Sequence, residues 1–136
     1  MKRQLSIILC IFLILGAFST AMATQGPSSR SSHVFHETTL SITFKNGNVY
    51  ALGSARADGT AQKLGIRSLR LFEDTGTSWM CIASAFDDYG YGVSEHDCIL
   101  SAPAVPGVEY KLVAVFYGEL GSYTDTVSQN LTVLND

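Results

Sequence analysis

The sequence is poor in basic residues. It has nine lysines and arginines against twelve aspartates and glutamates in 136 residues, and two of the nine, Lys2 and Arg3, lie at the N-terminus. A protein that binds nucleic acid needs clustered cations to neutralise the phosphate backbone. We therefore expect no nucleic-acid partner.

The motifs of the common enzyme classes are also missing. The chain contains no G-x-S-x-G turn, no H-E-x-x-H pair, no P-loop and no G-x-G-x-x-G fingerprint. Ser94, His96 and Asp97 offer the residue types of a catalytic triad, but closeness in sequence is not the geometry of nucleophile, base and orienting acid. We expect no cofactor and a protein that is not an enzyme; a small hydrolase or inhibitor with an unfamiliar site is the alternative.

Long apolar runs are confined to the N-terminus. There, Leu5 to Phe18 gives 14 mostly apolar residues, and Ala21-Met22-Ala23 offers the small residues of a signal peptidase site. We predict a signal peptide over residues 1–23 and a secreted, extracellular product with a formal charge of −5, from seven basic and twelve acidic residues. The alternative, a retained anchor, is disfavoured because a helix needs about 20 residues to span a bilayer.

Cysteine is scarce as well. Once Cys10 leaves with the signal peptide, only Cys81 and Cys98 remain. In an oxidising compartment this pair predicts one disulfide, which would close a loop of about 17 residues and stabilise the fold by about 3 kcal/mol. Two buried free thiols are the alternative.

The predicted disulfide suggests a register. If its two strands are hairpin neighbours, Trp79 lies opposite Leu100, and the turn centres on Tyr89 and Gly90. In the same register Ala83 lies opposite His96. If the strands belong to opposite sheets, the bond would instead cross the core.

The remaining chain divides into a leader and a strand-rich domain. Residues 24–37 are rich in serine and threonine with little periodicity, which predicts a flexible leader. From Thr38 onward, alternating runs separated by Gly, Asn, Asp and Pro indicate strands. We expect them after residue 38 and near 49–56, 63–73, 78–86, 96–102, 107–117 and 123–134. The 63–73 stretch fits a bulged strand or a short helix, and Gly65 favours the strand.

Seven strands with evenly spaced turns and no amphipathic helix predict an all-β fold, a single antiparallel β-sandwich over residues 38–134. The strand count, the strand with Trp79 and the Gly107-Val108-Glu109-Tyr110 corner resemble immunoglobulin-like and fibronectin type III domains. More loosely, the chain resembles small secreted bacterial proteins of unknown function that are built in this way. The resemblance implies an immunoglobulin-like sandwich and carries no particular ligand site.

The segment between the two cysteines is rich in carboxylates. Asp87, Asp88, Glu95 and Asp97 are the candidate metal ligands, because Ca²⁺ is held by converging oxygens. The residue spacing of an EF-hand is absent, so we favour the alternative, a solvated acidic hairpin tip without metal.

Tyrosines are the candidate recognition residues. Tyr89 and Tyr91 lie in the acidic segment, and Tyr117 and Tyr123 flank a later turn. Exposed tyrosines supply contact area at low entropic cost. Lys63, Arg67 and Arg70 form a small basic stripe, interpreted as a solvated strand face. The sequence thus predicts a secreted, non-enzymatic binding or surface-interaction module, with an extracellular protein or glycan as ligand.

Overall fold

The computed structural model describes residues 23–25 and 32–136. The predicted signal peptide lies outside these residues except for Ala23, and so do residues 26–31 of the predicted leader. No helix in the described part of the chain is long and apolar enough to cross a membrane.

The described residues form eight strands and no helix, which confirms the predicted all-β class and the strand interpretation of residues 63–73. Seven of the strands are long. The strands are β1 (Ala23–Gln25), β2 (Phe35–Lys45), β3 (Asn48–Ala61), β4 (Lys63–Asp74), β5 (Trp79–Gly90), β6 (Val93–Pro103), β7 (Glu109–Leu120) and β8 (Tyr123–Leu134).

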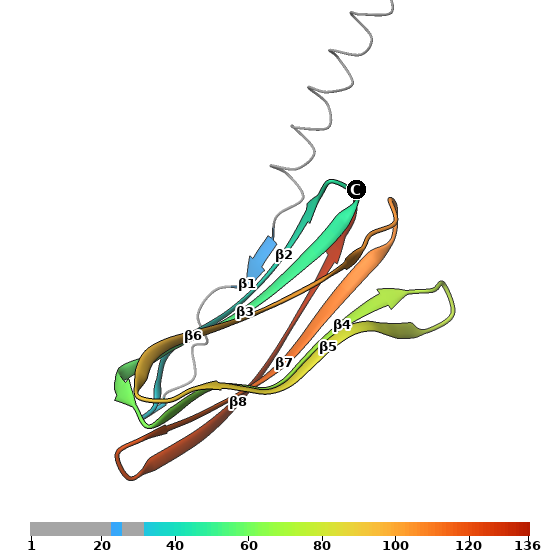
Figure 1. The fold of residues 1–136 in the computed structure, drawn as a ribbon. Coiled ribbons are helices and arrows are strands. Elements are labelled where there is room, and N and C mark those ends of the chain that lie inside the picture. Colours follow the sequence, from blue (N-terminus) through green and yellow to red (C-terminus); the bar gives the residue numbers. More distant parts are fainter. Residues whose placement is uncertain (1–22, 26–31) are drawn as a thin grey trace, which may run out of the picture.

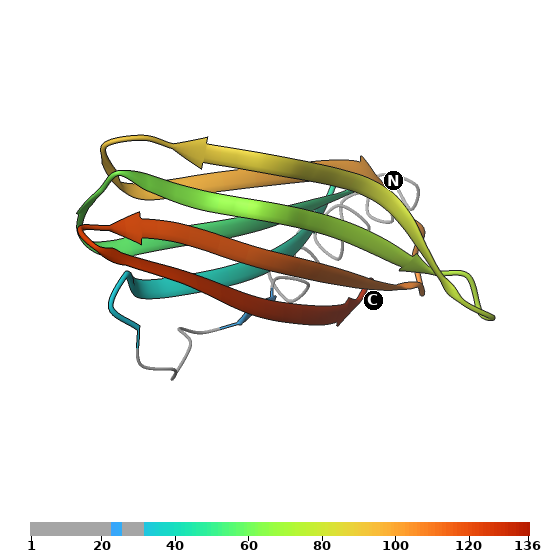
Figure 2. The same cartoon turned by 90° about the horizontal axis from the view of Figure 1, so that it is seen from below.

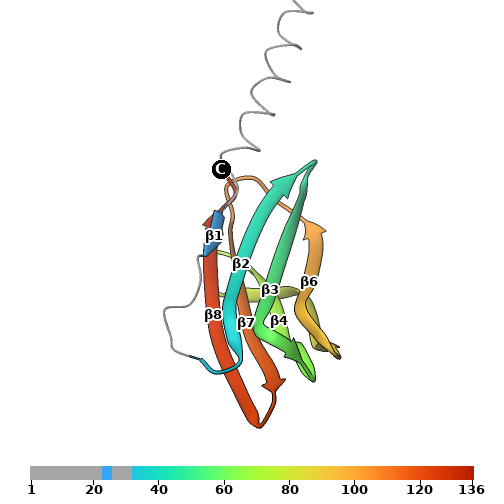
Figure 3. The same cartoon turned by 90° about the vertical axis from the view of Figure 1, so that its left-hand side faces the viewer.

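The strands form two antiparallel sheets that pack face to face (Figures 1 and 2). Sheet A has the order β1-β2-β3-β6, and sheet B has the order β5-β4-β7-β8. In Figure 3, β2, β3 and β6 follow one another across the view. The β5–β6 hairpin therefore passes from the edge of one sheet to the edge of the other.

The core lies between the sheets and is built by alternation. In β7, Tyr110, Leu112, Ala114 and Phe116 are all fully buried, as expected for a central strand with a side-chain period of two. In β4, buried residues occur on both phases of the sequence. A bulge at Arg67 shifts the phase, so that Ile66 and Leu69 both face the core.

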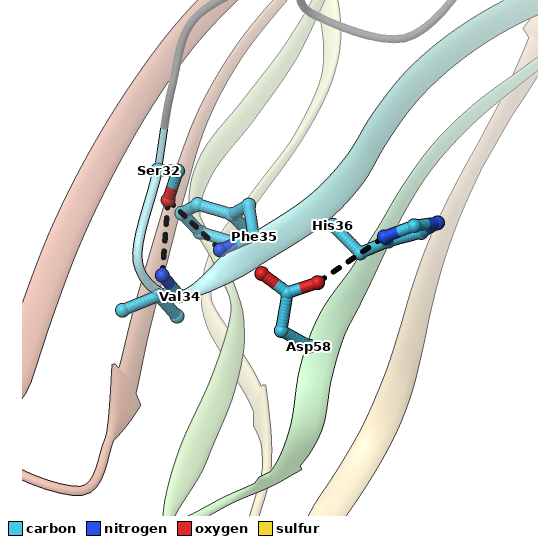
Figure 4. Close-up of polar contacts among 5 residues, drawn as sticks. All are labelled: Ser32, Val34, Phe35, His36 and Asp58. Carbon is cyan, nitrogen blue, oxygen red and sulfur yellow. Dashed lines mark hydrogen bonds and ion pairs between the residues drawn. The ribbon is translucent and has the colours of Figure 1, made fainter.

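The start of β2 differs from the sequence expectation. The strand begins at Phe35 rather than Thr38, and Val34 before it is fully buried. The Ser32 hydroxyl accepts hydrogen bonds from the backbone N–H groups of Val34 (3.1 Å) and Phe35 (2.9 Å), which fixes the entry into the strand (Figure 4). Val34 packs against Gly118, where an added Cβ would lie 2.7 Å from the valine Cγ1. This distant contact orders residues that were expected to be flexible.

The predicted hairpin register of β5 and β6 is wrong. Trp79 pairs with Asp74 of β4, and Leu100 pairs with Ala51 of β3. The two strands are joined by the turn Tyr91–Gly92 but do not pair along their length, because β5 joins sheet B and β6 joins sheet A. His96 and Ala83 are likewise in separate sheets.

A register shift in β5 also changes which side chains face the core. The shift occurs at Ile82, between the pairs Leu71–Ala83 and Phe72–Cys81. A bulge reverses the alternation of a strand. Ala83 therefore lies on the core side, whereas Cys81 and Trp79 face outward.

Candidate functional site

The outer face of sheet B collects aromatic and cationic side chains. The apolar alternates of β4 and β7 fill the core, so the remaining alternates of these strands point away from it. β5 extends the same face on one side. Two clusters form there, one at each end of β4.

The first cluster contains the two tyrosines that share a row with Gly65. Tyr89 and Tyr117 both pair with Gly65, from opposite sides, and their rings meet edge to face at 6.0 Å between centroids. The Lys63 ammonium lies 4.3 Å from the Tyr89 ring centroid, and the Arg67 guanidinium lies 4.8 Å from that of Tyr117. A cation over a ring face is attracted by the ring quadrupole. The glycine itself makes room for the β5 backbone and the His96 ring, which a Cβ at this position would meet.

Carboxylates hold the hydroxyl groups of both rings. Tyr117 donates a hydrogen bond to Glu119 (3.0 Å), and Tyr89 donates one to Asp87 (3.3 Å). The bond to Glu119 raises the pKa of Tyr117, because the negative carboxylate disfavours the phenolate. Both rings are therefore oriented, and Tyr117 is uncharged at neutral pH.

The second cluster lies at the other end of β4. The Lys111 ammonium lies 4.4 Å from the Trp79 ring and 5.7 Å from the Phe72 ring, and the Arg70 guanidinium lies 5.5 Å from the Phe72 ring. Trp79 is 38 % exposed. The only tryptophan of the chain therefore lies on the outer face of sheet B.

We call the two clusters together the cation-aromatic face. Its members are Lys63, Arg67, Arg70, Phe72, Trp79, Tyr89, Lys111 and Tyr117. It carries four of the six lysines and arginines within residues 32–136, although this stretch contains all twelve acidic residues. Basic charge in an acidic protein is therefore concentrated on one sheet face.

The structure brings together two of the four predicted recognition tyrosines. Tyr89 and Tyr117 belong to the cation-aromatic face, whereas Tyr91 lies in the β5–β6 turn and is 69 % exposed. Tyr123 begins β8 and stacks on His33 at 4.4 Å. The basic stripe of Lys63, Arg67 and Arg70, interpreted from the sequence as a solvated strand face, is part of this face and lies over its rings.

Sequence reasoning missed Phe72, Trp79 and Lys111 as surface partners. Trp79 was considered only as the partner of Leu100, and the bulge at Ile82 turns it to the outer face. Lys111 could have been found, because it lies on the outward phase of the strongest predicted strand.

The four predicted metal ligands do not converge. Asp88 bonds His96 at 2.8 Å, Asp97 accepts a hydrogen bond from Ser54 at 2.5 Å, and Asp87 accepts one from Tyr89. Glu95 lies opposite Arg56 on sheet A. Across the described ranges, no three His, Cys, Asp or Glu side chains are arranged to hold a metal ion.

The two cysteines are free in the structure, and the predicted disulfide is absent. Cys81 is exposed and Cys98 is buried. They cannot meet because the bulge turns Cys81 outward on sheet B while Cys98 faces inward from sheet A. The hydrogen-bonded partner of the Cys98 thiol is Asp88.

Asp88, His96 and Cys98 form a small polar network between the sheets. Hydrogen bonds from His96 and Cys98 lower the pKa of Asp88. Burial, together with the Asp88 carboxylate, raises the pKa of Cys98 to about 12, so its thiol stays protonated and is a poor nucleophile. A Cβ added to Gly65 or to Gly90 would come within 3.0 Å of the His96 ring. The ring therefore lies beneath β4 and β5. The network therefore joins the sheets, and the serine, histidine and acid set named from the sequence is not assembled.

Comparisons with known protein families, with curated proteins and with solved structures find no match.

Proposed function

We propose that this chain is an exported, non-enzymatic binding module whose recognition surface is the cation-aromatic face. The observation that carries the proposal is the concentration of four cations and four rings on one face of a rigid sheet in an acidic protein. Aromatic rings and cations that lie on the surface, where the folded core does not need them, are typical of recognition sites.

The ligand class that fits this face is an acidic polysaccharide. The clusters lie at the two ends of β4, and from Lys63 to Phe72 the strand rises by roughly 30 Å, so the face suits an extended polymer. The carboxylates of acidic sugars pair with the ammonium and guanidinium groups that lie along this strand. A protein partner is less well matched, because each of the four rings is covered by a cation.

We also propose that the sandwich is immunoglobulin-like, with the strand order of fibronectin type III domains. In support, the first, second and fifth long strands share sheet A, and the other four share sheet B. The Tyr110 hydroxyl, near the start of the sixth long strand, accepts a hydrogen bond from the Val105 N–H at 2.7 Å. A tyrosine that bonds upstream backbone in this way is a feature of such sandwiches.

Binding to polygalacturonate, measured by affinity electrophoresis and isothermal titration, tests the function. The exported protein should bind this acidic polymer, bind neutral dextran much more weakly, and lose affinity as salt rises. The double variant Lys63→Ala with Arg67→Ala should bind at least about tenfold more weakly, since a hydrogen bond to a charged group contributes about 1.5–3 kcal/mol.

The matched control is Lys45→Ala with Arg56→Ala, which removes the same charge from exposed positions of sheet A. It should bind as the unmodified protein does. Equal losses in both double variants would show a non-specific charge effect and overturn the assignment of the face. Preference for single-stranded DNA over polygalacturonate would overturn the assigned ligand class.

A further inference from the structure

The edge of sheet B formed by β5 lacks the protection that the other sheet edges have. A free strand edge presents unpaired N–H and C=O groups and is normally protected by charge, proline, a β-bulge or a covering strand. Of these devices, residues 79–86 of β5 have only the bulge at Ile82. β6 carries Glu95, Asp97 and Pro103, and β2 is partly covered by β1. β8 consists mostly of polar residues and carries Asp125. The first eight residues of β5, 79–86, contain no charge, no proline and no glycine.

This segment also exposes apolar side chains. Phe86 is 61 % exposed, Met80 49 % and Trp79 38 %, and no residue of β5 is fully buried. The only strand that hydrogen-bonds to β5 within the described residues is β4. The apolar surface and the open backbone groups therefore lie on the same strand.

The shape of the molecule leaves this edge accessible. Figures 1 and 2 show the β4–β5 hairpin reaching beyond the ends of the neighbouring strands. A partner can therefore approach β5 from the side without meeting the body of the sandwich.

We propose that β5 pairs antiparallel with β5 of a second copy, so that the two sheets B join into one continuous sheet across a two-fold axis. Two-fold pairing places the same sequence on both sides, so a run of like charge would repel itself, and residues 79–86 carry no charge at all. The partner segment is equally long, neutral and exposed.

The pairing register follows from the faces of the strand. With residues 79–86 fully overlapped, Trp79 lies opposite Phe86 of the second copy, and Met80 lies opposite Ala85. Trp79 and Phe86 are both outward, whereas Met80 and Ala85 are both on the core side, because the bulge at Ile82 occurs in each copy. Each residue thus meets one on its own face, as a sheet requires. The joined sheet places two cation-aromatic faces side by side.

Sedimentation velocity of the exported protein in a reducing buffer tests the pairing. The unmodified chain should form dimers in the micromolar to submillimolar range. Phe86→Lys and Met80→Lys each place charge in the neutral segment and should raise the dimer dissociation constant by about tenfold or more. A matched control on the β6 edge is Ile99→Lys, at a side chain 64 % exposed, which should remain dimeric.

Several results would overturn the proposal. These are a monomer at every concentration, a dimer unaffected by either β5 substitution although circular dichroism shows both variants folded, and a dimer abolished by Ile99→Lys. Cys81→Ser must also leave the dimer intact, because its loss would mean that thiol oxidation drives association. Polygalacturonate binding by the monomeric Phe86→Lys variant separates this pairing from the proposed function, since a monomer can still bind through its own face.

Discussion

The outer faces of the two sheets differ, although the core-facing side of each sheet is built from alternating apolar residues. Within residues 32–136, every cation that lies over an aromatic ring belongs to sheet B. On sheet A, the outward positions in the middle of β2 are Thr39, Ser41 and Thr43, which are small hydroxyl residues.

The two outer faces differ because only the core-facing positions are under the same packing demand. Both sheets need apolar residues on the core side, and β2 and β7 supply them with equal regularity. The outward phase is free of that demand, so its content reflects what the surface meets. Under the proposed function, the cation-aromatic face of sheet B is therefore the better candidate for recognition.

Among substitutions that test the difference between the two sheets, Gly65→Ala in sheet B is expected to reduce stability most. A Cβ at this position would overlap the backbone oxygen of Asp88 and lie 3.0 Å from the His96 ring. The strand between Tyr89 and Tyr117 would have to shift, so we expect the free energy of unfolding to fall by about 3 kcal/mol. Urea denaturation measures it.

Gly59→Ala is the control for that experiment. At Gly59 an added Cβ would make only an ordinary contact, at 3.8 Å from Leu120. Its effect should stay within about 0.5 kcal/mol. A comparable loss in both variants would show that strand propensity, and not the close approach at Gly65, is responsible.

The next largest effect is expected at the core end of sheet B, for Tyr110→Phe. The fully buried Tyr110 accepts a bond from the Val105 N–H and donates one to Glu73 at 2.8 Å. Removal of the hydroxyl leaves both partners unsatisfied and should cost about 1–3 kcal/mol in urea denaturation. Tyr50→Phe, on the outer face of sheet A, should change stability by less than about 0.5 kcal/mol. Equal losses of stability in Tyr110→Phe and Tyr50→Phe would contradict a stabilising role for the two hydrogen bonds of Tyr110.

A smaller effect, limited to alkaline pH, is expected from Cys98. Its native pKa of about 12 lies above the value of about 8.5 of an unfolded thiol. Above pH 8.5 the unfolded state therefore binds fewer protons than the native state, and stability falls by up to about 1.4 kcal/mol per pH unit. Cys98→Ser should remove this part of the slope in urea titrations between about pH 8 and 10. Cys81→Ser, at the exposed thiol on the other sheet, should leave it unchanged, and a slope that survives Cys98→Ser would contradict the assignment.

The smallest change in stability is expected when cations of the cation-aromatic face are removed. Lys63→Ala with Arg67→Ala removes cation–ring contacts that contribute about 0.5–1 kcal/mol each at exposed sites. The melting temperature should therefore fall by only a few degrees while polygalacturonate affinity falls at least about tenfold. A large stability loss with little change in binding would mean that the face is structural.

Much of the frame could be predicted from sequence because it rests on local signals. Alternation in residues 107–117 predicts the central β7, and Asn46-Gly47 predicts the β2–β3 turn, in which both residues have positive φ. The candidate site was found only in part. Tyr89, Tyr117 and the three basic residues of β4 were singled out, but nothing local said that β4 and β7 are neighbours and bring them together.

The sequence by itself determined the all-β class, the seven long strands and which side of β7 is buried, because turn residues and period-two alternation act within a few residues. Only the tertiary structure decided that β5 and β6 separate into different sheets, that the bulge at Ile82 turns Trp79 and Cys81 outward, and that Val34 is buried against Gly118. These outcomes depend on which strand is adjacent to which. The packing of the whole core decides which strands pair. The residues of a hairpin strand do not by themselves specify which of the two sheets the strand joins.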